Sequence, residues 1–399
     1  MTAQANHLRP STTHQTFDPS SILSEAILER IRERAAVADR ENAFFDEDLA
    51  ELRACGYLRA FVPTVSGGLG LGMREVTQLQ SRLATAAPAT ALAINMHLVW
   101  TGVANLLLER GDDSLSFVLD GAAAGELYAF GVSEAGNDLV LFGSDTEARP
   151  APDGSYRFFG RKIFTSLSPA WTWLGTTGLD TTSPDAPRVV YGFIERSRGG
   201  FEILDDWDTV GMRASQSRTT LLQGAQSRPE HIVRRLAPGP NPDAIVFGIF
   251  ACFETLIAAV YTGIGERALH LAVETAHRKT SKKADGATYA SDPDIRRRIA
   301  AAAIAYDGIL PQLQGIARDI DEQVDHGAMW FPKLVGLKVR ATETARDVVD
   351  QAIRVSGGGS YFASSELGRL YRDVLAGMFH PSDDESAHST VANAWLGPV

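Results

Sequence analysis

Val355-Ser-Gly-Gly-Gly-Ser-Tyr361 is the stretch that decides how this chain folds. The residues before it have helical spacing, and glycine ends helices readily because it accepts backbone angles that other residues avoid. A second, short helix is expected to end at Arg372-Asp373. A polar loop is expected from Phe379-His380-Pro381 to Glu385. The C-terminal part of the chain is therefore predicted to be helical, with its polar groups in a glycine turn and a loop.

The composition indicates a soluble globular protein. With 399 residues, 44% hydrophobic and 22% charged, the chain is long enough for roughly two to three domains. Its net charge of −11 argues against a nucleic-acid partner. The start of the chain lacks the apolar core of a signal peptide, and no run of about eighteen apolar residues is present, so a cytoplasmic location without a membrane span is predicted. Two cysteines cannot form a four-thiolate zinc site, and no metal is expected.

The pattern of apolar residues divides the chain into four parts. Helical spacing dominates residues 21–125 and returns over 241–399, where one apolar face runs along 334–352. Residues 126–240 instead contain short runs rich in Val, Tyr, Phe and Thr, which favour strands. The expected strands are 127–132, 156–159, 163–166, 189–194 and 219–222. We therefore predict a loose arm over residues 1–20, an N-terminal helical domain, a middle β domain and a C-terminal helical bundle.

Several short motifs occur in the order found in one flavoprotein family. They are Phe61-Val-Pro63 with Gly67-Gly-Leu-Gly70, Phe130-Gly-Val-Ser-Glu134, Gly160-Arg-Lys-Ile-Phe-Thr-Ser166, Gly211-Met-Arg-Ala-Ser215 and Arg278-Lys279. Together with the glycine turn and Arg372-Asp373, this order resembles the acyl-CoA dehydrogenase superfamily over roughly residues 20–385. The resemblance implies an α+β multidomain fold with an N-terminal α-helical domain, a middle β-barrel-like domain and a C-terminal α-helical bundle. It also implies a homo-oligomer, tetramer or dimer, and a flavin cofactor, FAD with FMN as the alternative.

The flavin is expected where strands end and where the glycine turn lies. Backbone N–H groups and hydroxyls suit the polar edges of a flavin ring, and apolar side chains suit its faces. The resemblance implies these cofactor-binding residues: Phe130, Val132, Ser133, Phe164, Ser166, Arg278, Gly357, Gly358 and Gly359. Phe164 stands where the family often has a tryptophan against the ring, and in the family the glycine turn serves the flavin of a neighbouring subunit. Residue types alone leave simpler alternatives open, a core strand residue for Phe164 and a helix end for the glycines.

The first functional hypothesis is an acyl-CoA dehydrogenase-like oxidoreductase with an electron-transfer partner. Such enzymes use a carboxylate to remove the α-proton of an acyl thioester while flavin N5 takes the β-hydride. The usual place of that carboxylate is Pro381 here, and a second known place falls on Phe253, with Glu254 adjacent and turned by about 100°. Glu254 is the candidate base, or else an ordinary polar residue, and the acidic residues 383–385 are another source of a carboxylate. Asn137 stands where relatives have a serine that helps to hold the thioester carrier, so it is the candidate substrate-binding residue.

The alternative is a reduced-flavin, dioxygen-dependent monooxygenase on the same fold. Such members of the superfamily form a C4a-hydroperoxide on the flavin, depend on a flavin reductase and need no carboxylate base. Some carry a histidine at the place of His380, a serine at the place of Ser166 and a histidine on an N-terminal helix, for which His97 is the candidate. Both histidines also fit ordinary loop or core positions. A third hypothesis, a binding protein without flavin, is disfavoured by the presence of Ser133 and Arg278.

Overall fold

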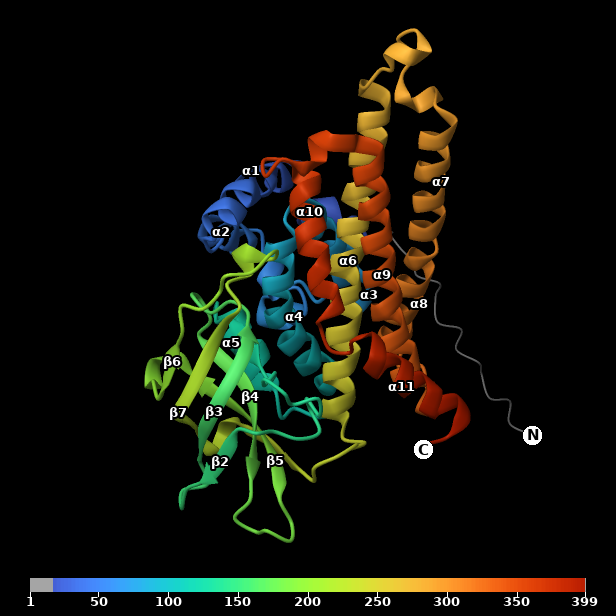
Figure 1. The fold of residues 1–399 in the computed structure, drawn as a ribbon. Coiled ribbons are helices and arrows are strands. Elements are labelled where there is room, and N and C mark those ends of the chain that lie inside the picture. Colours follow the sequence, from blue (N-terminus) through green and yellow to red (C-terminus); the bar gives the residue numbers. More distant parts are fainter. Residues whose placement is uncertain (1–16, 399) are drawn as a thin grey trace, which may run out of the picture.

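The computed structural model describes residues 17–398 and begins with a layer of helices (Figure 1). These are α1 (Glu25–Glu41), α2 (Asp46–Ala54), α3 (Met73–Ala86), α4 (Pro88–Glu109) and α5 (Ser116–Ala123). Pro88 separates α3 from α4, because proline lacks the N–H that an interior helix position needs but fits the first turn of a helix. Most of the predicted arm lies outside the described residues, and Pro19–Ser21 forms a single 3-10 turn.

The middle part of the chain forms one sheet of eight strands (Figure 1). The strands are β1 (Tyr128–Gly131), β2 (Glu147–Pro150), β3 (Tyr156–Thr165), β4 (Trp173–Asp180), β5 (Arg188–Glu195), β6 (Phe201–Ile203), β7 (Arg218–Ser227) and β8 (Ile232–Leu236). Their order is β6-β7-β3-β2-β4-β5-β8, and β1 pairs in parallel with β4 outside this path. The sheet thus places the ends of β1 and β3 close together, as the hydrogen bond from Ile163 N–H to the Ser133 carbonyl, 2.9 Å, confirms.

Local sequence predicts only part of this sheet. The runs expected at 156–159 and 163–166 join into the single strand β3. The sequence pattern does not predict β2, β4, β6 and β8. In β4, a Cβ at Gly175 would lie 2.4 Å from the indole of Trp100 on α4, so glycine is required there by packing against a distant helix. Strand propensity, which disfavours glycine, cannot anticipate that choice.

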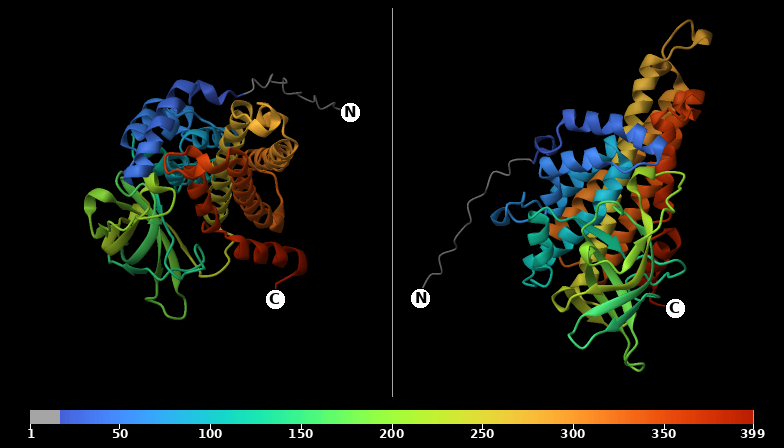
Figure 2. Two further views of the ribbon diagram at one scale, coloured as in Figure 1. Left: turned by 45° about the horizontal axis from the view of Figure 1, so that its top comes forward. Right: turned by 90° about the vertical axis from the view of Figure 1, so that its left-hand side faces the viewer.

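The C-terminal part is a bundle built around two long helices. Its members are α6 (Ala244–Arg278), α7 (Pro293–Asp307), α8 (Ile309–Asp321), α9 (Trp330–Ser356), α10 (Glu366–Val374) and α11 (Asp384–Leu396). α6 and α9 lie side by side, with α7 and α8 along one side of the bundle (Figures 1 and 2). The apolar face expected over 334–352 is confirmed, since Leu334, Leu337 and Ala341 are buried. The expected fold class, with helices before and after a β domain, is confirmed as well.

The segment after α10 differs from the polar loop that the sequence predicts. Asp383 accepts a hydrogen bond from the backbone N–H of Ser386 at 2.9 Å and caps α11. Asp384 and Glu385 lie in the first turn of that helix, where negative charge is favourable. These acidic residues therefore begin a helix, and the loop is shortened to residues 379–382.

Two helices, α4 and α6, are long and apolar enough to cross a membrane by length and composition. Most of each lies inside the fold, because 89% of the most apolar window of α4 and 78% of that of α6 are buried. Both are therefore core helices of this fold.

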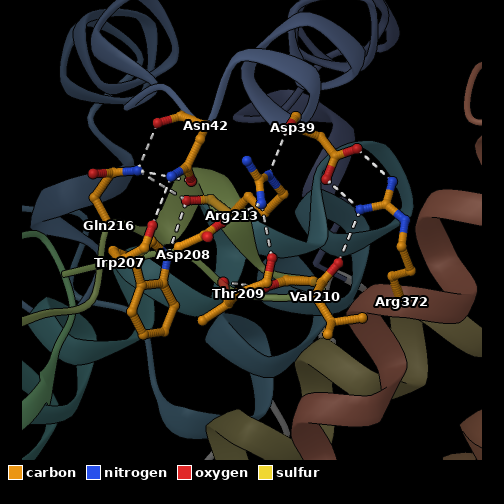
Figure 3. A network of polar contacts seen from close by, with 10 residues as sticks. Asp39, Asn42, Trp207, Asp208, Thr209, Val210, Arg213, Gln216 and Arg372 are labelled. Carbon is orange, nitrogen blue, oxygen red and sulfur yellow. Dashed lines mark hydrogen bonds and ion pairs between the residues drawn. The ribbon is translucent and has the colours of Figure 1, made fainter.

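Two residues at the end of α10, Arg372 (Figure 3) and Asp373, join the helical parts to the β domain. The Arg372 guanidinium forms a bidentate ion pair with Asp39 of α1, with N···O distances of 2.9 and 2.5 Å, and donates to the carbonyl of Val210 at 3.0 Å. Asp373 is buried and accepts a hydrogen bond from the backbone N–H of Met212 at 2.6 Å. The connection between β6 and β7 is thus held by two charged groups of α10.

A second set of contacts ties the same connection to α1 and the turn after it (Figure 3). The side-chain amide of Gln216 donates to the carbonyl of Asn42 at 2.8 Å, and the Asn42 amide donates to the carbonyl of Trp207 at 2.6 Å. The Arg213 guanidinium donates to the carbonyl of Asp39 at 2.9 Å. The β6–β7 connection therefore has fixed neighbours in both helical parts.

Gly211 permits this close approach, so replacing it should weaken the junction. A Cβ at Gly211 would lie 2.2 Å from the carbonyl oxygen of Arg372, a backbone atom that cannot move aside alone. We expect Gly211→Ala to lower the free energy of unfolding by about 1–3 kcal/mol in urea titrations. Gly315→Ala on α8 is the control, because nothing lies within 4 Å of its added Cβ and alanine favours helix, so stability should stay equal or rise. Equal effects of the two substitutions would contradict the role of the close contact.

Candidate active site

His380 lies in the short loop between α10 and α11, against the long helix α6. Its ring nitrogen Nε2 is 2.9 Å from the hydroxyl of Tyr261 on α6. A Cβ at Gly377 would lie 2.8 Å from the Tyr261 ring and 2.9 Å from Thr342 on α9, so glycine is required where the chain passes between these two helices. The loop is thus brought close enough to α6 for its histidine to bind a buried tyrosine.

Two buried groups of opposite charge hold the backbone of this loop. Lys338, on α9, has a side chain that is 1% exposed, and its Nζ donates to the carbonyls of Gly377, His380 and Ser382 at 3.0, 2.9 and 2.7 Å. Oε1 of Glu254, on α6, accepts from both the backbone N–H and the hydroxyl of Ser382, each at 3.1 Å. The loop is therefore fixed from both long helices.

Burial determines the charge states in this cluster. Burial raises the pKa of Glu254, and the Lys338 ammonium opposes part of that shift. Burial lowers the pKa of Lys338, and Glu254 opposes it. Burial first, and then the charge of Lys338, lower the pKa of His380 to about 3, so its imidazole is neutral at physiological pH. Within residues 17–398 the other oxygen of Glu254, Oε2, is buried without a hydrogen-bond partner.

The end of β3 forms a second cluster, next to the β6–β7 connection. Phe164 has left-handed backbone angles, with φ of 54°, and its side chain is 54% exposed. Its ring meets that of Trp207 edge to face, with centroids 6.1 Å apart. The hydroxyl of Ser166 lies 2.7 Å from that of Ser217, which lies 2.8 Å from that of Ser215. A strained backbone that exposes an aromatic ring beside a row of hydroxyls is typical of a binding site.

These groups fit a flavin ring, which needs an apolar surface against one face and hydrogen-bonding groups along its edges. The exposed ring of Phe164 offers the apolar surface. Ser133 is half-buried beside the end of β3, and the hydroxyl of Thr165 is buried without a partner among the described residues. Of the predicted residues, Phe164 and Ser133 are therefore accessible to the ring, whereas the hydroxyl of Ser166 is buried and bound to Ser217.

The side chains of Phe130 and Val132 lie too deep in the core to contact a ligand. Both side chains are buried, and Phe130 packs against Trp100 of α4 and Phe253 of α6, with ring centroids 5.2 and 5.8 Å apart. These two residues thus belong to the core between the β domain and the helices. Only their backbone groups remain for a ligand.

Asn137 takes part in a network around a buried ion pair. Its side chain donates to Glu134 at 2.7 Å and accepts from the backbone N–H of Leu139 at 2.9 Å. Glu134 also binds the buried Lys162 ammonium at 2.6 Å. Burial opposes ionisation of Glu134, but the charge and hydrogen bonds of Lys162 and its other partners together lower its pKa to about 2. The Asn137 side chain is therefore engaged in the turn after β1.

His97 of α4 lies in the core and is not brought to His380. Its Nδ1 accepts from the backbone N–H of Tyr128 at 3.2 Å, so Nε2 carries the proton and donates to the carbonyl of Leu58 at 2.7 Å. Burial lowers the pKa of His97 to about 4. Because both of its ring nitrogens bind backbone groups, His97 is a core residue and is not part of the proposed site.

The end of α6, which is Arg278, and the glycine turn after α9 lie at the end of the bundle that is remote from β3 (Figure 1). The Lys279 ammonium donates to the carbonyl of Ser356, which brings the end of α6 beside the turn. Gly357 has φ of 68°, which glycine adopts readily, and Arg278 is exposed. Within one chain these residues do not share a site with Phe164.

Tyr261, Lys338 and Ser382 are site residues that the sequence analysis does not single out. Lys338 leaves a signal, because it interrupts the apolar face that Leu334 and Ala341 form at helical spacing. A charge in such a face indicates a buried, paired group. Tyr261 leaves no signal, since an aromatic residue in an apolar helix is expected in the core.

Fold and site together define the class of this protein. The family described as "Acyl-CoA dehydrogenase, C-terminal domain" matches residues 255–384. Butyryl-CoA dehydrogenase from Megasphaera elsdenii has the same fold, with a TM-score of 0.84 at 20% identity over 95% of this chain and 98% of that one. The chain belongs to the acyl-CoA dehydrogenase superfamily of flavin-dependent oxidoreductases.

Individual relatives come from two branches of that superfamily. L-evernosamine nitrososynthase from Micromonospora sp. is 28% identical over 90% of this chain and 85% of that protein. Putative acyl-CoA dehydrogenase YdbM from Bacillus subtilis is 27% identical over 92% and 94%, and dibenzothiophene monooxygenase from Rhodococcus erythropolis is 24% identical over 95% and 93%. The structure of KijD3 in complex with FMN and dTDP-3-amino-2,3,6-trideoxy-4-keto-3-methyl-D-glucose matches with a TM-score of 0.81 at 26% identity, over 96% of this chain and 95% of that one.

The neutral His97 should make the fold sensitive to acid. Its pKa is lowered to about 4 in the folded chain, whereas an unfolded histidine titrates near about 6.5, so between these values the unfolded chain binds the extra proton. Stability should therefore fall as the pH drops from about 6.5 to about 4, by at most about 1.4 kcal/mol per pH unit from this residue. Urea unfolding at several pH values should show a smaller slope for His97→Gln. The control is His388→Gln, at an exposed histidine, which should keep the slope of the unmodified protein. An unchanged slope in His97→Gln would disprove the assignment of this pH dependence to His97.

Proposed function

We propose that this protein is a reduced-flavin, dioxygen-dependent monooxygenase that acts on a small apolar substrate. The observation that carries the proposal is the neutral His380, held against Tyr261 in the loop where dehydrogenases of the superfamily present a carboxylate. Pro381, at the usual position of that base, has no acid–base group. Glu254, adjacent to the alternative position at Phe253, has one oxygen bound to Ser382 within the same loop. The loop thus offers a histidine in place of a carboxylate.

Phe164, Ser133 and Ser166 are the residues that would hold the flavin ring. A bound reduced flavin supplies the electrons that activate dioxygen. The exposed Phe164 ring would keep water from one face of the flavin, and the half-buried Ser133 would bind its polar edge. The hydroxyl of Ser166 is buried against Ser217 and would have to leave that partner to join it. His380 adds the N–H group of a neutral imidazole, next to the Tyr261 hydroxyl. FMN is supported over FAD by the FMN that KijD3 binds.

An apolar substrate is supported by the side chains that stay exposed on the segments around the site. The large apolar ones are Phe164, Val210, Met378 and Phe379. Exposed apolar side chains gathered on neighbouring segments favour a binding site. The cations that contact these segments are already engaged: Arg372 with Asp39, Lys338 with backbone carbonyls, Arg213 with the carbonyls of Asp39 and Thr209, and Arg346 with Glu343. A substrate without a diphosphate or another strong negative charge therefore suits the site best.

An acyl-CoA dehydrogenase is the second candidate, because Glu254 has an oxygen free for a ligand. Among residues 17–398, Oε2 of Glu254 has no partner, and burial raises the pKa of this carboxyl, as it does for a base in a dry pocket. The Asn137 side chain, in contrast, is already bound to Glu134 and Leu139, which weakens its candidacy as a contact of the thioester carrier.

We further propose a cytoplasmic homo-oligomer supplied by a separate flavin reductase. The glycine turn and Arg278 lie away from β3, so they are available to a neighbouring subunit rather than to the flavin of their own chain. Tyr361 and Phe362, next to the turn, are exposed apolar residues that an interface would cover. Light scattering on the purified protein tests this point.

Oxygen dependence separates the two enzymes. The protein is loaded with FMN, reduced anaerobically, and mixed with isotopically labelled dioxygen and a panel of apolar aromatic compounds. It should then transfer one labelled oxygen atom to a product. Oxidised protein under anaerobic conditions should keep its flavin colour when acyl-CoA thioesters are added. Anaerobic bleaching by an acyl-CoA would overturn the proposal in favour of the dehydrogenase.

His380 should matter for turnover more than for flavin binding. Because His380 supplies the polar N–H group of the site, we expect His380→Ala, which removes both ring nitrogens, to lower kcat by about 10²–10³-fold while the flavin dissociation constant stays the same. The control is His388→Ala, at an exposed histidine on α11 bound to the carbonyl of Asp384. Unchanged turnover in His380→Ala would remove this residue from the mechanism.

A further inference from the structure

Tyr261 has one hydrogen-bond partner among the residues that the structure describes, and it is Nε2 of His380. The tyrosine side chain is fully buried on α6. A phenol has a single O–H donor, whereas a neutral imidazole has one N–H and one bare nitrogen. Either ring could donate across the 2.9 Å contact, so the relative energies of the two arrangements decide which one is present.

Donation from the tyrosine is the favourable arrangement. If Nε2–H donated to the phenol oxygen, the hydroxyl hydrogen of Tyr261 would be buried without an acceptor, which costs the desolvation penalty of that donor. If the phenol donates to Nε2, both partners of the contact are satisfied. Burial also raises the pKa of Tyr261 well above its usual value, which keeps its proton on the oxygen. The proton of the neutral imidazole must then be on Nδ1.

Hydrogen bonds also fix the backbone around His380, in addition to the contact of its ring with Tyr261. An ammonium has three N–H groups, and those of Lys338 match the three carbonyls of Gly377, His380 and Ser382. Glu254 accepts from both donors of Ser382. His380 remains half-buried, so the nitrogen that Tyr261 does not use is the one left for a ligand.

We propose that Tyr261, Lys338 and Glu254 are positioning residues that present Nδ1–H of His380 to the active site. Tyr261 fixes the tautomer, and the two buried charges fix the loop that carries the ring. In this tautomer Nδ1 donates a hydrogen bond to an oxygen atom and cannot accept one. The use of this donor in turnover rests on the proposed function, but the tautomer is a property of the resting protein and is measured without substrate.

Nitrogen NMR of the full-length protein, labelled with ¹⁵N in histidine only, tests the tautomer directly. The His380 signals, identified by their loss in His380→Asn, should show a protonated Nδ1 and an unprotonated Nε2. Tyr261→Phe keeps the ring volume but removes the donor, so Nε2 should shift toward the protonated form. Tyr306→Phe, which removes a hydroxyl bound to Glu266, is the matched control and should leave both signals unchanged. A proton on Nε2 in the unmodified protein, or no shift in Tyr261→Phe, would overturn the role of Tyr261.

Turnover separates this inference from the proposed function. We expect Tyr261→Phe to lower kcat about three- to tenfold, the worth of one hydrogen bond, with KM unchanged. A tautomer change in NMR without any loss of kcat would leave the positioning role intact and argue against the use of His380 in catalysis. The absence of the tautomer change would reject the positioning role whatever the activity.

Hydrogen exchange tests the two charged residues. Lys338→Met leaves three carbonyls without their donor, so the backbone amides of residues 377–380 and of Ser382 should exchange faster than in the unmodified protein. Lys333→Met changes an exposed lysine on the same helix and serves as the control. If Lys338→Met does not fold, Glu254→Ala should speed exchange of the Ser382 amide. Unchanged exchange of this loop in the variants that fold would contradict the role of the buried pair.

Discussion

The ammonium of Lys338 is the group on which the candidate site depends. A buried charge is tolerated only when its donors are filled and an opposite charge is near. Here three carbonyls of the loop between α10 and α11 fill the donors, and Glu254 provides the opposite charge. A loop of this length has no ladder of backbone bonds to define its shape. Its conformation must therefore come from the side chains that reach it from α6 and α9.

The same helix, α10, relates this loop to the candidate flavin cluster. Asp373 binds the backbone of Met212, and Arg372 binds Asp39 and Val210, so the end of α10 is fixed against the β6–β7 connection. That connection carries Trp207, whose ring contacts the strained Phe164. A shift of α10 would move the loop that carries His380 and the pair of rings formed by Trp207 and Phe164 together. The two clusters are thus connected through α10 although separate parts of the chain build them.

The sequence predicts what depends on local pattern and misses what depends on distant partners. The glycine turn at Gly357 and the apolar face of α9 follow from helical spacing and from the backbone freedom of glycine. The residue type at Gly175 follows from Trp100, which lies in another part of the chain. Glu254 can be named from its position on α6. Its role depends on Ser382, which is 128 positions away and outside the reach of any periodicity.

His97 and His380 show the same limit, because nothing in the residue type separates a core histidine from a site histidine. The backbone partners of His97 come from two other segments, whereas among residues 17–398 one ring nitrogen of His380 has no hydrogen-bond partner. The exchange of a base for a histidine also has an electrostatic reason. A carboxylate at position 381 would stand next to Ser382, which Glu254 binds, and two like charges at close range cannot both stay ionised. Pro381 avoids that conflict. A neutral imidazole beside Lys338 carries a polar N–H group into the pocket without adding a second negative charge, so the buried Glu254 and a histidine-based site are compatible where two carboxylates are not.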